Sequence, residues 1–209
     1  MTPGAQTGAL PQARQILEFW LGDALSLGWP SESRSGLWFG GGEALDRQIE
    51  ADFGDLVRNA VTGGLSGWEA APLDRLALVL LLDQFTRNVF RGSAKAFCGD
   101  TRALALALDT MDRGWDAELP LAGRTFLMLP LSHAESLDAQ ERAVAYISRQ
   151  AATAPKTQAG VLDGHVKSAL EHRDIIAAFS RFPHRNSTLG RISTPAEEAW
   201  LVSGKRFGQ

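Results

Sequence analysis

Cysteine is almost missing from this 209-residue sequence, in which Cys98 is the only one. A single thiol excludes an intramolecular disulfide framework and a zinc site made of several thiolates. Its scarcity fits a reducing compartment, and we expect a cytoplasmic protein. The first residues also lack a cationic segment that leads into an apolar one, so we expect no secretory signal.

Long apolar runs, strand-like alternation and an excess of positive charge are missing too. The longest strongly apolar run is LALVLLL at 76–82, well short of the roughly 20 residues that a membrane-spanning helix requires. The formal net charge of −3 argues against general nucleic-acid binding, which usually needs a basic face. We therefore expect neither a membrane nor a nucleic acid as a partner.

Apolar residues instead recur at helical spacing along nearly the whole chain, which predicts an all-α fold. Short connections favour antiparallel helix pairs packed as a bundle or a short α-solenoid. We expect one domain over 10–203, preceded by a flexible tail over 1–9. The expected helices cover 12–21, 43–61, 73–90, 101–113, 121–129, a segment from Ser136 or Asp138 to just before Pro155, 163–182, and a last segment after Thr194.

Several residues mark the expected ends of these helices. Asp100 is expected to cap the helix over 101–113. Pro130 is expected to close the helix over 121–129. Pro183 is expected to end the helix over 163–182, and APKTQAG at 154–160 has the composition of a linker. The sequence TPAE, beginning at Thr194, predicts a capping box.

The helix expected over 73–90 changes character halfway along. Its first part, 73–82, is apolar on all sides, which is typical of a buried helix. Asp83, Arg87 and Arg91 then follow at intervals of four, on one stripe of the helix, and Asp83 before Arg87 is the favourable order for an ion pair. Two neighbours widen the polar patch, Gln84 and Asn88. Because an unpaired buried charge costs several kcal/mol, these groups either form a structural ion-pair network or face a wet pocket.

Two further constellations contain histidine. His165 and His172 lie two turns apart on the core-facing side of the helix over 163–182, too far apart to share one metal ion. In PLSHAES, at 130–136, Glu135 stands close enough to His133 to orient its ring and tune its pKa, the usual setting for proton transfer. The alternative is that His133 and Glu135 only cap two helix ends, and that His165 and His172 are ordinary core residues.

The stretch RFPHRNSTLGR, at 181–191, holds three arginines and a histidine but no acid. The planar guanidinium fork suits carboxylate or phosphate, so the cluster predicts an acidic partner from elsewhere. Together with Arg87 and Arg91 the site would hold five arginines against two acids, Asp83 and Glu135. That excess predicts an anionic ligand, and the rival explanation is that water solvates some of the arginines.

Three segments carry a resemblance to a known family. DQFTRNVFRG at 83–92, HAES at 133–136 and SRFPHRNSTLGRIST at 180–194 resemble the signature segments of the uncharacterised, mostly bacterial family called domain of unknown function 924. The resemblance extends over about Ile16 to Leu201 and implies a tetratricopeptide-like helical fold, with no established activity.

The resemblance also implies a set of marked polar positions. In this chain they are Asp83, Gln84, Arg87, Asn88, Arg91, His133, Glu135, His172, Arg181, His184, Arg185, Asn186 and Arg191. One position departs from the family pattern, because Ala134 stands where a serine usually separates the His and the Glu. A mechanism that needs that hydroxyl is therefore not expected here.

These observations lead to two hypotheses about function. The first is a protein that binds an anionic small molecule or an acidic peptide. The second is an enzyme acting on an anionic substrate, with His133 or His184 as general acid or base and Glu135 or Asp83 orienting it. A variant of the second is a hydrolase whose metal is held by His133, Glu135 and His184, but we expect no metal and no cofactor. The geometric expectation is that the charged end of the helix over 73–90, the 133–135 turn and the 181–191 stretch meet around one polar pocket.

Overall fold

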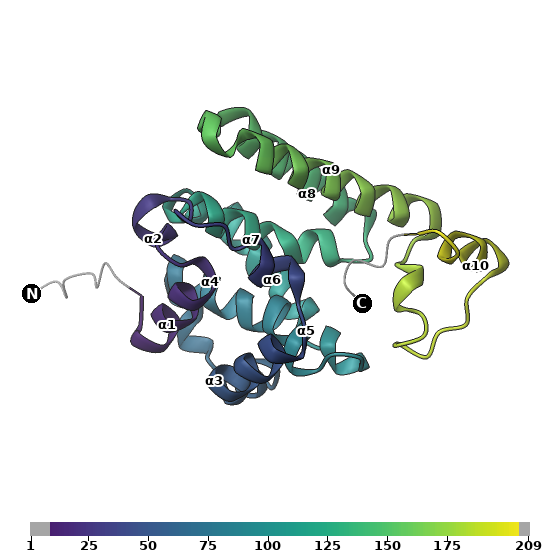
Figure 1. Ribbon diagram of the computed structural model, residues 1–209, viewed down its shortest axis with the longest axis horizontal. Coiled ribbons are helices and arrows are strands. Elements are labelled where there is room, and N and C mark those ends of the chain that lie inside the picture. Colours follow the sequence, from purple (N-terminus) through teal and green to yellow (C-terminus); the bar gives the residue numbers. More distant parts are fainter. Residues whose placement is uncertain (1–8, 205–209) are drawn as a thin grey trace, which may run out of the picture.

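The computed structural model describes residues 9–204, which form helices joined by short turns (Figure 1). In order they are α1 (Pro11–Leu21), α2 (Ala24–Leu27), η1 (Gly36–Gly40), α3 (Glu43–Val61), η2 (Ser66–Ala70), α4 (Pro72–Leu80), η3 (Leu81–Phe85), α5 (Thr86–Val89), η4 (Ala94–Phe97), α6 (Asp100–Asp112), η5 (Trp115–Glu118), α7 (Leu121–His133), α8 (Leu137–Thr153), α9 (Lys156–Phe179), η6 (Pro183–Arg185) and α10 (Pro195–Leu201). No strand occurs within residues 9–204, so the all-α prediction is confirmed. The tail expected over 1–9 lies outside the described residues, apart from Ala9.

The main core surrounds α4. This helix contacts α1, α6 and α7, and its apolar side chains from Leu76 onward are almost completely buried. Trp20 of α1 packs edge-on against Phe85 and Phe126, with ring centroids 5.3 and 5.6 Å apart. The prediction of a helix buried on all sides is therefore confirmed. A smaller cluster, containing Ile176 and Phe182, lies where α9 ends.

Antiparallel pairing is clearest in α7, α8 and α9, which follow one another with short connections. Each packs on the next, and Figure 1 shows α8 and α9 side by side along one edge of the molecule, with α10 beyond the C-terminal end of α9. These contacts agree with an all-helical bundle. The tetratricopeptide-like character, the domain limits 10–203 and the cytoplasmic location stay predictions. No helix within residues 9–204 is both long and apolar enough to cross a membrane.

Two expected bounds of the long helix α9 are wrong. The segment at 154–160 is not a linker, because α9 already begins at Lys156, directly after Pro155, and packs along α8. A proline just before a helix fits its first turn, where the missing N–H has no intrahelical partner. The helix also ends earlier than expected, at Phe179, because Ser180 adopts a left-handed conformation with φ 58°.

Pro130 does not close α7, which continues to His133. The end of this helix is held from outside by the buried Gln140 of α8. Its Nε2 donates to the carbonyl oxygens of Ser132 (2.7 Å) and Ala134 (2.8 Å). Tertiary hydrogen bonds therefore support the helix end that follows the proline, and His133 stands on its last turn.

The helix expected over 73–90 is continuous but not regular. Between α4 and α5 the chain forms the π-helical turn η3, which is wider than an α-helical turn. Asp83 lies inside this turn and Arg87 after it, so the four-residue interval no longer places them on one stripe. The predicted Asp83–Arg87 ion pair is accordingly wrong, and each residue has another partner.

Other helix ends agree with the sequence. The bounds of α3 are those expected, and the Ser136 side chain caps α8 by accepting from the backbone N–H of Ala139. Thr194 and Glu197 form the expected capping box at the start of α10. Asp100, however, is the first residue of α6 rather than its cap, which is Gly99. The carboxylate of Asp100 is therefore available to other partners.

Candidate functional site

The centre of the site is a pair formed by Asp83 of η3 and His133 of α7. Asp83 is completely buried, and its Oδ1 lies 2.7 Å from His133 Nδ1. Gln84 Nε2 donates to its other oxygen at 2.5 Å. Burial alone would raise the pKa of Asp83, but His133, Arg87 and Gln84 outweigh it and hold the pKa below its ordinary value. A charged Asp83 favours the tautomer with the proton on Nδ1, which leaves His133 Nε2 as the basic nitrogen.

A second carboxylate, Asp100 of α6, is shared by two arginines. Arg87 Nη2 donates to its Oδ1 at 2.7 Å, and Arg185 Nη1 lies 3.7 Å from its Oδ2. Arg87 also donates to the carbonyl oxygen of Ala96. Burial raises the pKa of Asp100, and the nearby Asp83 carboxylate adds to this effect. Asp100 is therefore one carboxylate that faces two guanidinium groups.

The third carboxylate, Glu135, attaches the 181–191 stretch to the end of α7. It accepts two hydrogen bonds from Arg191, at 2.6 and 2.9 Å, and one from the backbone N–H of Phe182 at 2.8 Å. Burial opposes ionisation, but the bonds from Arg191 and Phe182 prevail and hold the pKa of Glu135 below its ordinary value. Glu135 is thus a partner of Arg191. Of the two residues expected to orient His133, Glu135 or Asp83, it is Asp83 that bonds to the ring.

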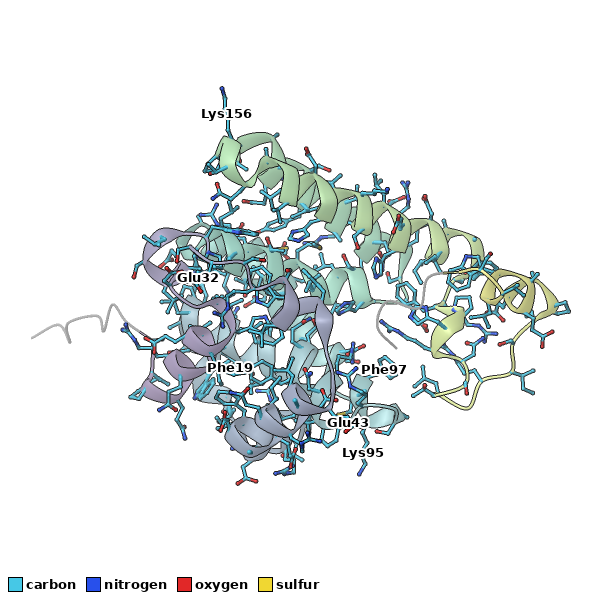
Figure 2. The ribbon with its side chains drawn as sticks, in the orientation of Figure 1. Phe19, Glu32, Glu43, Lys95, Phe97 and Lys156 are labelled. Atoms are coloured by element: carbon cyan, nitrogen blue, oxygen red, sulfur yellow. The ribbon has the colours of Figure 1, made fainter. Side chains whose placement is uncertain are left out.

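Between these groups lies a pocket of about 370 Å³. Its lining comes from η4, α6, α7, the 134–136 turn and the segment after α9, and consists of Phe97, Asp100, Thr101, Leu104, Pro130, His133, Ala134, Glu135, Ser136, Arg185 and Leu189. Figure 2 shows Phe97 at the side of the helical body that faces the 183–194 segment. Two of the three charged segments, 133–135 and 181–191, thus line this pocket. The charged end of the 73–90 helix does not line it and only contacts lining residues, Asp83 through His133 and Arg87 through Asp100.

Arg185 is the arginine among the lining residues of this pocket, and it is buried, with an exposed fraction of 6 %. Its guanidinium carbon lies over the rings of Phe97 and Phe182, 4.8 and 4.5 Å from their centroids. Nη1 donates to the carbonyl oxygen of His133 at 3.0 Å, whereas the buried Nε has no hydrogen-bond partner within residues 9–204. Burial, and then repulsion from Arg87, lower the pKa of Arg185 to about 10. The positive charge at this position is therefore under-compensated.

Three predicted site residues have partners away from the pocket. Arg91 donates to both oxygens of Asp46 on α3, at 2.6 and 2.9 Å, and Asn88 also bonds to Asp46. Arg181 forms a two-pronged pair with Glu197 of α10, at 2.6 and 2.7 Å. Both acids, Asp46 and Glu197, lie outside the segments that the sequence marks as the site. The expected ratio of five arginines to two acids is consequently wrong. Among these five arginines, Arg185 is the one without a carboxylate oxygen closer than 3.7 Å.

Two further predicted residues, His172 and His184, contact residues of the site but do not line the pocket. His172 of α9 is buried, bonds through Nδ1 to the carbonyl oxygen of Ser168 (2.8 Å), and lies 6.4 Å from the His133 ring. Burial lowers the pKa of His172 to about 4. His184 packs against Phe182 and Trp200, and burial likewise lowers its pKa to about 4.

Asn186 fixes the turn that carries Arg185. Its Oδ1 accepts from Arg191 Nε at 3.0 Å, and its Nδ2 donates to Ser193 Oγ at 3.0 Å.

Within residues 9–204 no group of three His, Cys, Asp or Glu side chains could hold a metal ion. In particular, the side chains of His133, Glu135 and His184 do not come together as one set of metal ligands. The metal-assisted variant of the enzyme hypothesis therefore has no ligand set among these residues.

Some residues of the site were not foreseen. The sequence predicts Asp100 only as a helix cap, and no sequence pattern points to Phe97, Phe182 or Gln140. Phe97 and Phe182 support Arg185, and Gln140 fixes the turn that presents His133. The sequence does contain one signal that Asp100 could belong to the site. It is an acid at a helix start directly after Gly99, and such an acid can point toward a basic residue of a neighbouring segment. The two phenylalanines carry no such signal.

Comparisons with known proteins agree with this architecture. A family model described as "Bacterial protein of unknown function (DUF924)" matches residues 16–205. A search of curated proteins found no match. The solved structure of ATU0120, a protein of unknown function from Agrobacterium tumefaciens, is similar with a TM-score of 0.73 and 35 % sequence identity, over 92 % of this chain and 97 % of that one.

Proposed function

The chain belongs to this bacterial DUF924 family of unknown function, and from the chemistry of its pocket we propose that it binds a small molecule through an anionic group. The observation that carries the proposal is Arg185. Its guanidinium is buried in the pocket wall and keeps a buried Nε without a partner within residues 9–204. Its nearest carboxylate oxygen, on Asp100, is 3.7 Å away, and Asp100 already bonds to Arg87. An anion placed beside Arg185 would supply the missing counter-charge.

The surroundings of Arg185 support the same reading. Phe97 and Phe182 hold the guanidinium in place, so little conformational freedom is lost when a ligand binds. Thr101 and Ser136 add hydroxyl groups to the lining. The pocket volume of about 370 Å³ falls within the range of small-molecule sites, roughly 300–1,000 Å³. An acidic peptide is the other anionic partner expected from the sequence, and it serves as one arm of the test.

The test is a thermal-shift titration with acetate, inorganic phosphate and a short Glu-rich peptide. A ligand at about 100 times its Kd stabilises the native state by about 2.7 kcal/mol, which raises the Tm of a protein of this size by roughly 5–10 °C. We expect such a rise for at least one small anion and none for the peptide.

Arg185→Gln removes the positive charge and keeps a side-chain N–H that can still donate to the carbonyl of His133. We expect it to abolish the shift. Arg142→Gln is the matched control, since Arg142 pairs with Asp112 on the surface of α6 and α8. Circular dichroism confirms that both variants fold. The proposal is wrong if no anion shifts the wild-type protein, or if Arg185→Gln responds as the wild type does.

A second candidate function is acid–base catalysis on the bound anion, and the Asp83–His133 pair favours it. The buried carboxylate orients the ring through Nδ1, and Nε2 has no partner within residues 9–204. Here His133 Nε2 accepts a proton from a water molecule while the water oxygen adds to an acyl carbon, and the leaving group departs with the electrons of the broken C–O bond. Asp83 is thus the orienting residue of this candidate, one of the two, Glu135 or Asp83, expected from the sequence.

The probe for this candidate is mono-p-nitrophenyl glutarate, an ester with one anionic end, followed by release of p-nitrophenolate. We expect hydrolysis that His133→Gln and Asp83→Asn each reduce by about 10²-fold or more, the usual range for general acid–base catalysis. Glu141→Gln, on the exposed face of α8, should hydrolyse the ester like the wild type. Hydrolysis that does not depend on His133 would exclude this mechanism.

A further inference from the structure

The walls of the pocket are of two kinds. One part carries polar groups, with Arg185 as the under-compensated cation. The other part is apolar and is contributed by four residues of different segments: Phe97, Leu104, Pro130 and Leu189. Since Phe97 also supports the Arg185 guanidinium, the cation and the apolar wall are contiguous. A ligand that fills the pocket therefore contacts a cation at one end and apolar surface over the rest.

The acids in the lining restrict the charge of the ligand. Asp100 and Glu135 both face the pocket, and each is already paired with an arginine, Asp100 with Arg87 and Glu135 with Arg191. A second negative charge on the ligand would lie near these carboxylates rather than near a free cation. Such like-charge repulsion selects against dianions. The site consequently suits a ligand with one negative charge.

Resting on the anion-binding function proposed above, we propose that the ligand is a small monocarboxylate with an apolar tail. Its carboxylate binds Arg185, and its tail lies against Phe97, Leu104 and Leu189. The planar guanidinium matches the fork of a carboxylate, and the low polarity of the neighbouring rings strengthens the ion pair. The same pocket discriminates against inorganic phosphate, which has no tail, and against dicarboxylates, which carry a second charge.

The test is isothermal titration of the full-length protein with acetate, butanoate and hexanoate, followed by pentanedioate, inorganic phosphate and hexan-1-ol. Affinity should increase about three- to fourfold for each methylene that becomes buried, so hexanoate should bind about 80 to 250 times more tightly than acetate if all four methylenes are covered. Hexan-1-ol keeps the tail but lacks the charge, and pentanedioate keeps the carboxylate but adds a second charge. Both should bind at least tenfold more weakly than hexanoate.

Two variants separate the tail from the head group. Leu104→Asn places an amide in the apolar wall and should reduce the preference for hexanoate over acetate while acetate binding stays unchanged. Leu189→Asn has the same expected effect from another segment and serves if Leu104→Asn does not fold. Leu27→Asn is the matched control, because Leu27 is 63 % exposed and lines a different pocket.

The outcomes distinguish this inference from the function on which it rests. Equal affinities along the chain-length series, or tighter binding of phosphate or pentanedioate than of hexanoate, overturn the monocarboxylate while leaving the anion site in place. Absence of binding by every anion overturns both. A chain-length preference that persists in both leucine variants shows that the tail lies elsewhere and also contradicts the proposal.

Discussion

At the scale of single residues, three of the predicted site arginines each have a carboxylate partner of their own. Asp46 holds Arg91, Glu135 holds Arg191 and Glu197 holds Arg181, each through two hydrogen bonds. Two-pronged arginine–carboxylate pairs fix geometry as well as charge. Against these pairs Arg185 is the exception, because its nearest carboxylate is 3.7 Å away and is already bonded to Arg87.

Glu197 allows one of these pairs to be tested by pH. The bonds from Arg181 and Thr194 lower the pKa of Glu197 from 4.5 to about 2. Because the folded-state pKa is depressed, the stabilisation is fully present above about pH 4.5 and is lost as the pH falls toward 2. Glu197→Gln should therefore be less stable than the wild type at pH 6, and the difference should shrink between pH 4.5 and 3.

Urea unfolding at pH 6, 4.5 and 3 measures this difference directly. Glu198→Gln, a neighbour on the exposed side of α10, is the control and should follow the wild type at every pH. A gap between wild type and Glu197→Gln that stays constant from pH 6 to 3 would show that the carboxylate contributes nothing through its charge.

At the scale of elements, the site depends on how closely α6 approaches the α4–η3–α5 run. Gly99, the residue before α6, lies directly on the backbone of Leu82, where an added Cβ would collide with the Leu82 carbonyl. This close approach brings Asp100 within 2.7 Å of Arg87. The π-helical turn η3 meanwhile directs Asp83 to His133 rather than to Arg87. A glycine and a wide turn therefore decide which charges meet.

Gly99→Ala should destabilise the protein by about 1–3 kcal/mol or more, because a backbone carbonyl cannot move aside as a flexible side chain can. Gly160→Ala is the matched control. Gly160 lies inside α9 with open space around the position of an added Cβ, so alanine there should stabilise by about 0.5–1 kcal/mol. Chemical denaturation of the two variants gives both values, and opposite signs are the expected result. Equal effects would show that the approach at Leu82 is not tight.

At the scale of the whole molecule, the pocket lies between two parts of the chain. One is the helical body up to α8, and the other is the segment after α9, which supplies Arg185 and Leu189. Figure 1 shows this segment and α10 beyond the C-terminal end of α9. Glu135 joins the two parts, because it accepts from Arg191 and from the backbone of Phe182. The segment is thus attached to the body through Glu135 and also through the bond from Arg185 to the carbonyl oxygen of His133.

Glu135→Ala should therefore loosen the 182–194 segment without unfolding the body. Hydrogen bonds to a charged group are worth about 1.5–3 kcal/mol, and partial exposure of the pair reduces that value, so amide exchange in 182–194 should quicken by about tenfold. Exchange in α4 should stay unchanged. Hydrogen-exchange mass spectrometry measures both regions, with Glu198→Ala as the control. Faster exchange throughout the chain would instead assign Glu135 to the global fold.

The sequence by itself determined the fold class, most helix bounds and the segments that form the site. Helical periodicity, the apolar run at 76–82 and the capping box at Thr194 are local patterns, and local patterns act wherever the chain folds. The meeting of 83–87, 133–135 and 181–191 was also predictable, because isolated charged segments beside buried helices need compensation.

Only the tertiary structure decided which charged group pairs with which. Asp83 bonds to His133 rather than Arg87, and Asp46, Asp100 and Glu197 neutralise arginines that seemed unpaired. Pairing depends on distances of a few ångströms between segments up to about a hundred residues apart, which no local spacing encodes. A π-helical turn or the close approach at Gly99 shifts side chains by that amount. For this reason the position of the under-compensated cation of the pocket, Arg185, follows from packing alone.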